Sequence, residues 1–286
     1  MAPPRALRAT QAAGRAALYA LAGGALAGSV AMAVQRWSVL QLILDAEAFE
    51  DAADAAAPAP AANGTGMGGA MGEEEEMLEP GGARNLCTWA SDMIMGCGYG
   101  LLLLASAVLR GERVSANSGG GYGLCGFFAF QFLPALGLAP ELPAMVAADI
   151  VARQLWWTAR VALVSLGIFL WSLPPPMAAA LTRTADEPKA RQLARALAAL
   201  VLIVTLAVPT PEHPKEHGPV PAELEGQFVG HALFSTLCFW LALGSAIGAL
   251  LERDKAMCAW IASDLDFAAS NEDGRELEEK GQAVGV

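Results

Sequence analysis

The sequence predicts an all-α, polytopic helical membrane protein with about six transmembrane helices and both termini on the cytoplasmic side. Of its 286 residues, 55% are hydrophobic and only 16% are charged, and the mean hydropathy is +0.40. Such a chain is too apolar for an ordinary soluble domain and too long for a single span. The distribution of Lys and Arg around the apolar runs supplies the orientation.

Six apolar runs approach or exceed the length needed to cross about 30 Å of hydrocarbon. They lie at residues 16–34, 87–109, 121–138, 155–173, 193–208 and 228–251, and the fifth is close to the minimum. Basic residues gather on one side of the resulting topology: Arg5, Arg8, Arg15, Arg110, Arg113, Arg183, Lys189, Arg191, Arg195, Arg253 and Lys255 there, against Arg36, Arg84, Arg153, Arg160 and Lys215 opposite. The richer side is assigned to the cytoplasm.

The first run follows an Arg-bearing, Ala-rich stretch that imitates a signal or transit peptide. Its length favours an uncleaved first span, and organelle targeting stays open for a eukaryotic source. Gly24 and Gly28 in this run, like Gly244 and Gly248 in the last, have the spacing that lets helices approach closely. Tight packing is the simpler interpretation of these pairs, and a gating hinge is the alternative.

The segment after the first span, RWSVLQLILDAEAFE, mixes apolar and acidic residues and predicts an amphipathic helix at the outer surface. Residues 51–84 are rich in Ala, Pro and Gly with an acidic run, so we expect a disordered outer insert. The chain then divides into a six-helix membrane domain at 1–258, containing this insert, and an acidic polar tail at 259–286.

Asp92 enters the second span near its outer boundary, where a carboxylate is either paired structurally, for example with Arg160, or functional. The connection at 109–121 carries turn residues and is expected to be an ordinary inner loop. At the outer side Pro140 and Pro143 end the third span, because proline lacks the N–H that a helix needs.

The start of the fourth run carries Asp149, Arg153, Gln154 and Arg160, which are expected to face other helices or to pair. Arg153 and Arg160 are predicted to be structural counter-charges. The adjacent Trp156 and Trp157 are most simply part of an interfacial aromatic belt. Three prolines end this span, and a basic inner loop, TRTADEPKARQLAR, is expected to follow.

All histidines of the chain lie around the start of the last span. Glu212-His213 and Glu216-His217 repeat at a spacing of four, and His231 lies within the span. Imidazole and carboxylate suit divalent first-row metals, and weak multi-site ligation suits a transport path. The candidate metal ligands are therefore His213, His217, His231, Glu212, Glu216 and Asp92, with Glu47 or Glu50 as further entry residues. The alternatives are a solvated loop and a hydrogen-bonded packing histidine at position 231.

Several classes of function are disfavoured by what the sequence lacks. It contains no nucleophile motif, phosphate loop or dinucleotide fingerprint, so catalysis is not expected, although Asp92 with His231 as acid and base is the remaining enzymatic alternative. No basic patch is available for nucleic acid. The five cysteines lack metal-finger or redox spacing and are expected to be buried hydrophobes. No cofactor is predicted.

Three segments resemble the CbtA family of predicted cobalt transporter subunits. These are the Gly-rich first span with Gln35 and LILDAEAFE, the segment GFFAFQFLPALGLAPELPAMVAADIVARQLWW, and EHGPVPAELEGQFVGHALFSTLCFWLALGSAIGALLER. The resemblance implies five or six spans, cobalt uptake linked to cobalamin synthesis, and a small single-span, His-bearing partner, CbtB. This chain departs from the family by its acidic insert, its acidic tail and an outer loop poor in histidine.

The sequence thus predicts a membrane subunit of an uptake permease for a divalent transition metal, cobalt first and nickel or zinc next. Its outer His/Glu loop would capture the ion. The alternative is a non-transporting scaffold or accessory subunit. The protein would lie in a bacterial-type plasma membrane, or in an organelle membrane of a eukaryote, in contact with lipid. Without an ATP-binding motif, the energy source would be the membrane potential, a coupled ion or another subunit.

Overall fold

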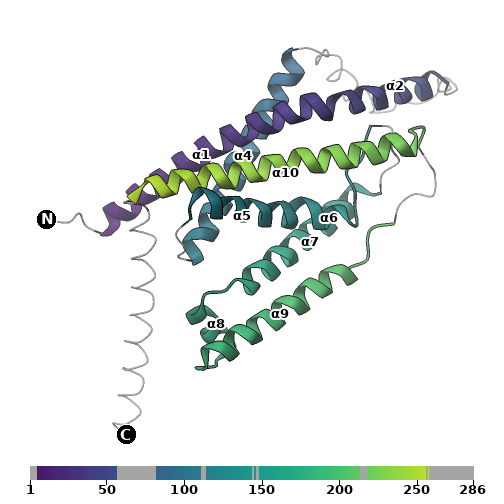
Figure 1. The fold of residues 1–286 in the computed structure, drawn as a ribbon. Coiled ribbons are helices and arrows are strands. Elements are labelled where there is room, and N and C mark those ends of the chain that lie inside the picture. Colours follow the sequence, from purple (N-terminus) through teal and green to yellow (C-terminus); the bar gives the residue numbers. More distant parts are fainter. Residues whose placement is uncertain are drawn as a thin grey trace, which may run out of the picture.

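The computed structural model describes residues 5–56, 82–110, 114–143, 145, 148–212, 218–255 and 257. In these ranges the regular structure is entirely helical, which confirms the predicted fold class (Figure 1). The elements are α1 (Arg5–Ser38), α2 (Leu40–Ala56), α4 (Gly82–Arg110), α5 (Ala116–Phe127), the π-helix η1 (Phe128–Phe132), α6 (Leu133–Ala135), α7 (Ile150–Trp171), α8 (Pro175–Thr182), α9 (Glu187–Ala207) and α10 (Ala222–Arg253).

Five helices in the described part of the chain are long and apolar enough to cross a membrane: α1 from Thr10, α4, α7, α9 and α10. They correspond to five of the six predicted runs. The remaining run forms α5, η1 and α6, a helical stretch divided by the π-turn. The chain is therefore an integral membrane protein. The number of crossings and the cytoplasmic position of the termini stay predictions.

Helices α1, α4, α5 and α10 form the larger of two helical groups, with α1 and α10 running antiparallel side by side (Figure 1). Glycines allow the close approach. The backbones of Gly24 and Gly96 are in contact across the α1–α4 interface. Gly244 and Gly248 of α10 lie directly against the backbone of α5. Both predicted glycine pairs are thus packing sites.

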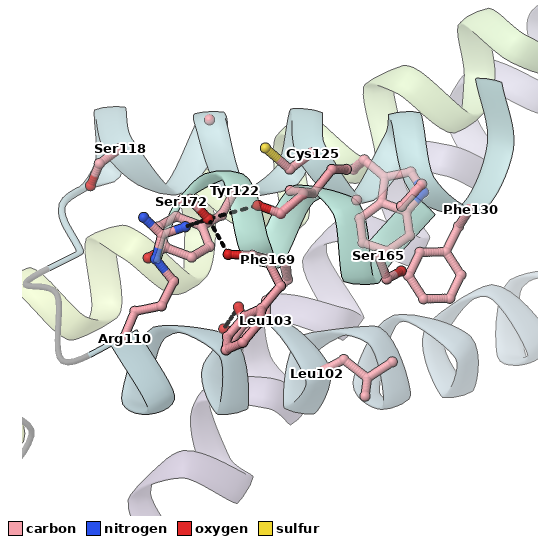
Figure 2. A pocket seen from close by; sticks show the side chains of 16 residues that line it. Leu102, Leu103, Arg110, Ser118, Tyr122, Cys125, Phe130, Ser165, Phe169 and Ser172 are labelled. Atoms are coloured by element: carbon pink, nitrogen blue, oxygen red, sulfur yellow. Dashed lines mark hydrogen bonds between the residues drawn. The ribbon is translucent and has the colours of Figure 1, made fainter. Parts of the chain in front are cut away.

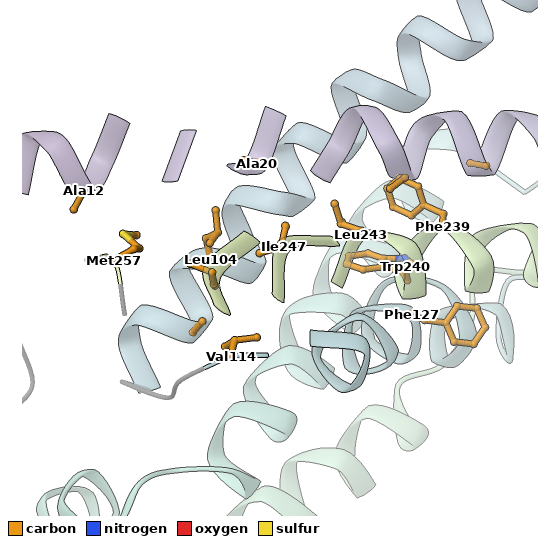
Figure 3. Packing of buried hydrophobic residues seen from close by; sticks show 14 residues of the cluster. Ala12, Ala20, Leu104, Val114, Phe127, Phe239, Trp240, Leu243, Ile247 and Met257 are labelled. Carbon is orange, nitrogen blue, oxygen red and sulfur yellow. The ribbon is translucent and has the colours of Figure 1, made fainter. Parts of the chain in front are cut away.

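A continuous apolar core fills this larger group (Figure 3). Leu243 and Ile247 of α10 lie between Ala20 of α1 and Leu104 of α4, and all four side chains are almost fully buried. At one end of the core the ring of Trp240 stacks on Phe130, with ring centroids 5.4 Å apart. The many alanines of α1 let its neighbours approach closely, so this core is built from small side chains facing large ones.

Helices α7, α8 and α9 form the smaller group, which meets the larger one chiefly through η1 and α6. Asp149 caps α7 by accepting a hydrogen bond from the backbone N–H of Ala152 at 2.9 Å. Pro174 precedes α8, and α8 ends at Arg183, which adopts the left-handed conformation with φ 52°. This tight turn returns the chain into α9, which packs against α7.

Two predicted inner loops are shorter than the sequence suggested. Residues 116–121 begin α5 instead of forming a turn, because Ser115 and Ser118 make a reciprocal capping box. Similarly, α9 begins at Glu187 within the predicted basic loop, capped by Asp186. In both cases a local N-terminal cap starts the helix inside a segment whose Gly-rich or charged composition favoured a loop.

The predicted insert is helical at its described edges, since α2 continues to Ala56 and α4 begins at Gly82. Residues 57–81 lie outside the described residues, as does the predicted tail at 259–286. The predicted division into domains is therefore still a prediction.

Candidate functional site

Asp92 is the one acidic residue placed well inside α4, ten residues and roughly 15 Å beyond the first residue of the helix. The side chain of Gln35 on α1 lies within interaction range of this carboxylate. One of its oxygens, Oδ2, is buried and has no hydrogen-bond partner among the residues described. A buried carboxylate oxygen without a donor is costly, and such groups are concentrated at functional sites of membrane proteins.

The suggested structural partner of Asp92 was wrong. Arg160 is 4% exposed and lies over the ring of Trp156, with its guanidinium carbon 4.9 Å from the ring centroid. Its Nε has no hydrogen-bond partner in the described part of the chain, and no contact links it to Asp92. Gln35, which does lie beside Asp92, is at the end of the first apolar run. A polar side chain at the end of that span was the sequence feature that could have pointed to this neighbour.

A small groove of about 110 Å³ lies between α1, the start of α2 and the start of α4. Its lining mixes polar residues, Gln35, Arg36, Arg84, Asn85 and Thr88, with apolar ones, Met32, Val39, Leu40 and Ile43. Thr88 is one helical turn before Asp92, so the two residues share a face of α4. Asp92 itself is not among the residues that line the groove.

An ion pair lies beside this groove and joins α2 to α4. The guanidinium of Arg84 donates two hydrogen bonds to Glu47 of α2, with N–O distances of 2.6 and 3.3 Å. Glu47 thereby ties α2 to the start of α4. Its predicted role as an entry residue stays a prediction. Both side chains are about one third exposed.

The other candidate ligands do not form a cluster with Asp92. His231 is exposed on α10, and Glu212 is exposed after α9. His213, Glu216 and His217 lie outside the described residues. In the ranges that the structure covers, no three His, Cys, Asp or Glu side chains come together in a way that could hold a metal ion. The proposed metal ligands are thus untested as a set.

The predicted role of Arg153 as a counter-charge agrees with its contact. Its guanidinium lies 2.6 Å from the carboxylate of Glu141, which belongs to the Pro-rich hairpin before α7. The aromatic-belt interpretation holds less well, because Trp156 is 6% exposed and packs against Gly137 of that hairpin. Trp157 is 37% exposed. Ion pair and buried ring together fix the hairpin onto α7.

This arrangement combines a membrane-embedded carboxylate with helices held in backbone contact beside it. A carboxylate of this kind can bind a cation transiently, and among the described residues it has no cluster of further ligands that would hold a metal permanently.

Comparison with known proteins gives one informative match. No curated protein and no solved structure matches the chain. A family model described as "probable cobalt transporter subunit (CbtA)" matches residues 14–252, which includes every helix from α2 to α9, most of α1 and nearly all of α10. A transporter family favours transport over catalysis, and the word subunit implies partners in a transport complex. The chain belongs to the CbtA family of probable cobalt transporter subunits.

Proposed function

We propose that this protein is the membrane subunit of an uptake permease for a divalent transition metal, with cobalt as the substrate. Family membership supports the substrate class, and five membrane-length helices support the location. A divalent cation moving inward gains about 4.6 kcal/mol per 100 mV of membrane potential, so the potential can drive uptake.

The buried, unpartnered Oδ2 of Asp92 is the observation that supports a path through this subunit. Gln35 lies beside the carboxylate, and Oδ2 has no hydrogen-bond partner among the described residues. An ion that reaches the level of Asp92 would exchange part of its water shell for this oxygen. A single ligand of this kind gives weak binding, which release on the far side requires.

The outer loop is proposed to capture the ion before it enters. Glu212, His213, Glu216 and His217 supply imidazole and carboxylate groups, and His231 follows on α10. The imidazoles favour cobalt, nickel and zinc over magnesium and calcium, and the carboxylates add negative charge without that selectivity. A small single-span, His-bearing subunit of the CbtB kind is the proposed partner, and a bacterial-type plasma membrane is the proposed location.

Uptake of radiolabelled cobalt into a host that lacks its own cobalt transporter tests this function. The chain is expressed alone and with a candidate single-span subunit, beside a variant with His213, His217 and His231 replaced by Ala. Cobalt uptake by the wild type and its loss in the variant, at equal amounts in the membrane, are the expected results. Equal uptake by both proteins would remove the histidines from the path.

A second candidate function is an accessory subunit that transports nothing by itself. The close packing of α1 on α4 favours it, because backbone contacts at Gly24 and Gly28 fill the space beside Asp92. Neither the groove at the outer end of α4 nor the large cavity described below includes Asp92 or His231. On this alternative, cobalt uptake would require the partner subunit and would survive the replacement of Asp92 by Asn.

A further inference from the structure

A cavity of about 540 Å³ separates the two helical groups (Figure 2). One face each of α4, α5 and α7 lines it, and η1 and Trp240 of α10 lie at the end opposite Arg110. On α5 the lining residues include Ser118, Gly121, Tyr122 and Cys125, which follow the helical repeat, and Ala129 and Phe130 of η1 continue the row. The cavity therefore extends along roughly 18 Å of α5 and η1 between Ser118 and Phe130.

Polar groups are gathered at one end of this cavity. Arg110, the last residue of α4, donates a hydrogen bond to the hydroxyl of Ser172 at 2.7 Å, and its guanidinium lies 5.3 Å from the centre of the Tyr122 ring. Ser118 lines the same end (Figure 2). Farther in, the lining is apolar and includes Leu102, Phe130 and Trp240. An elongated apolar space with a cationic end is complementary to an anionic amphiphile.

The lining argues against a route for the metal. Apart from scattered Ser and Cys side chains it is apolar, so it offers few ligands to replace the water of a divalent cation. The positive charge of Arg110 attracts a phosphate, which Arg binds through paired N–H donors.

Basic residues also gather elsewhere at this end of the bundle. Arg183, Lys189, Arg191 and Arg195 lie at the turn between α8 and α9, next to the end of α7. Among these, Lys189 and Arg191 are paired with Asp186 and Glu187, and Glu252 accepts a hydrogen bond from the backbone N–H of Ala116. Basic residues at a membrane surface attract anionic lipids.

We propose that this cavity binds one anionic phospholipid, with its phosphate at Arg110 and an acyl chain along α5 between α4 and α7. The lipid fills the space between the two helical groups and joins them where protein contacts are few. This site is independent of the proposed metal path, so its test reads lipid binding and not transport.

Native mass spectrometry of the purified full-length protein tests the site, with phosphatidylglycerol and phosphatidylcholine of identical acyl chains as probes. We expect one tightly held phosphatidylglycerol and a preference of roughly fivefold over phosphatidylcholine, the factor that one surface cation supplies. Arg110→Gln should abolish the preference. Equal retention of the two lipids by the wild-type protein would overturn the role of Arg110.

A matched pair of glycine variants tests occupancy of the cavity itself. Gly121 lines the cavity and Gly98 of α4 does not, and an added Cβ meets no atom within 4 Å at either position. Gly121→Leu should lose the retained phosphatidylglycerol, whereas Gly98→Leu should keep it. Identical retention by both variants would show that the lipid binds elsewhere.

Labelling of Cys125 provides a test on the unmodified protein. This cysteine lines the cavity, so bound lipid should slow its reaction with a maleimide, as mapped by peptide mass. We expect added phosphatidylglycerol to protect Cys125 several-fold more than phosphatidylcholine does. If a photoactivatable cross-linker on Cys125 captures a second polypeptide and no lipid, the cavity is a protein-docking site and the proposal is wrong.

Discussion

Replacing Gly28 by Ala should loosen the α1–α4 interface that surrounds Asp92. A Cβ at this position would lie 2.7 Å from the backbone nitrogen of Met93 and 2.8 Å from the carbonyl carbon of Asp92. Ordinary contact begins at 3.4 Å, so the shorter distance is about 0.7 Å too close. Because the contacted atoms are backbone, no side chain can rotate away and the two helices must separate.

The magnitude of this effect follows from two opposing contributions. Removing a glycine from a helix gains up to about 1 kcal/mol in intrinsic helix stability. Overpacking a close interface costs about 1–3 kcal/mol. We therefore expect a net loss on the order of 1 kcal/mol at Gly28. Any accompanying shift of α4 also changes the position of Asp92 relative to Gln35.

The matched control is Gly14→Ala on the same helix, where an added Cβ meets nothing within 4 Å. Thermal or denaturant unfolding of the purified protein in detergent measures both variants. Gly14→Ala should be neutral or slightly stabilising, and Gly28→Ala should unfold at a lower temperature than the wild type. Equal stability of the two variants would refute the inference that backbone contact governs this interface.

Two further predictions concern ion pairs outside the apolar spans. Burial alone would raise the pKa of the Asp254 carboxyl, but hydrogen bonds from the Tyr19 hydroxyl and the Arg15 guanidinium outweigh it and hold this pKa at about 2. The charged carboxylate thus stabilises the fold above pH 4, and this contribution is lost as the pH falls from about 4 to about 2. Asp254→Asn should therefore lower the unfolding temperature at pH 7. Between about pH 4 and pH 2, the unfolding temperature of the variant should fall less steeply than that of the wild type. For the hairpin, Arg153→Gln should lower the free energy of unfolding by about 1 kcal/mol, because Glu141 is only 13% exposed and loses its partner. Adding Glu141→Gln should recover part of this loss, and a double variant no more stable than the single one would contradict the pairing.

The features that were predictable from sequence depend on local chemistry. The spacing of Gly24 and Gly28 predicted a close helix contact, and Pro140 and Pro143 predicted a break between two helices. Each signal depends on residues within a few positions of one another. The positions of the long helices were predictable for the same reason, because an apolar run of membrane length has few other structures available to it.

What the sequence left undetermined depends on pairing over long distances. A lone Asp92 could face any neighbouring helix, and its partner proved to be Gln35 and not Arg160. Trp156 has the composition of a lipid-facing belt, yet Gly137 provides space for its ring in the protein interior. The π-turn at Phe128–Phe132 falls in a uniformly apolar stretch, where hydrophobic periodicity gives no warning of it.

The central claim, that cobalt passes Asp92 in the membrane, is tested most directly by flux into proteoliposomes that contain the purified chain. The comparison is between the wild type, Asp92→Asn, and the control Asp149→Asn, in which Asn preserves the helix cap. The account predicts saturable uptake of radiolabelled cobalt that grows with an inside-negative potential, persists in Asp149→Asn and is lost in Asp92→Asn. Potential-driven uptake of equal rate in all three proteins would contradict it.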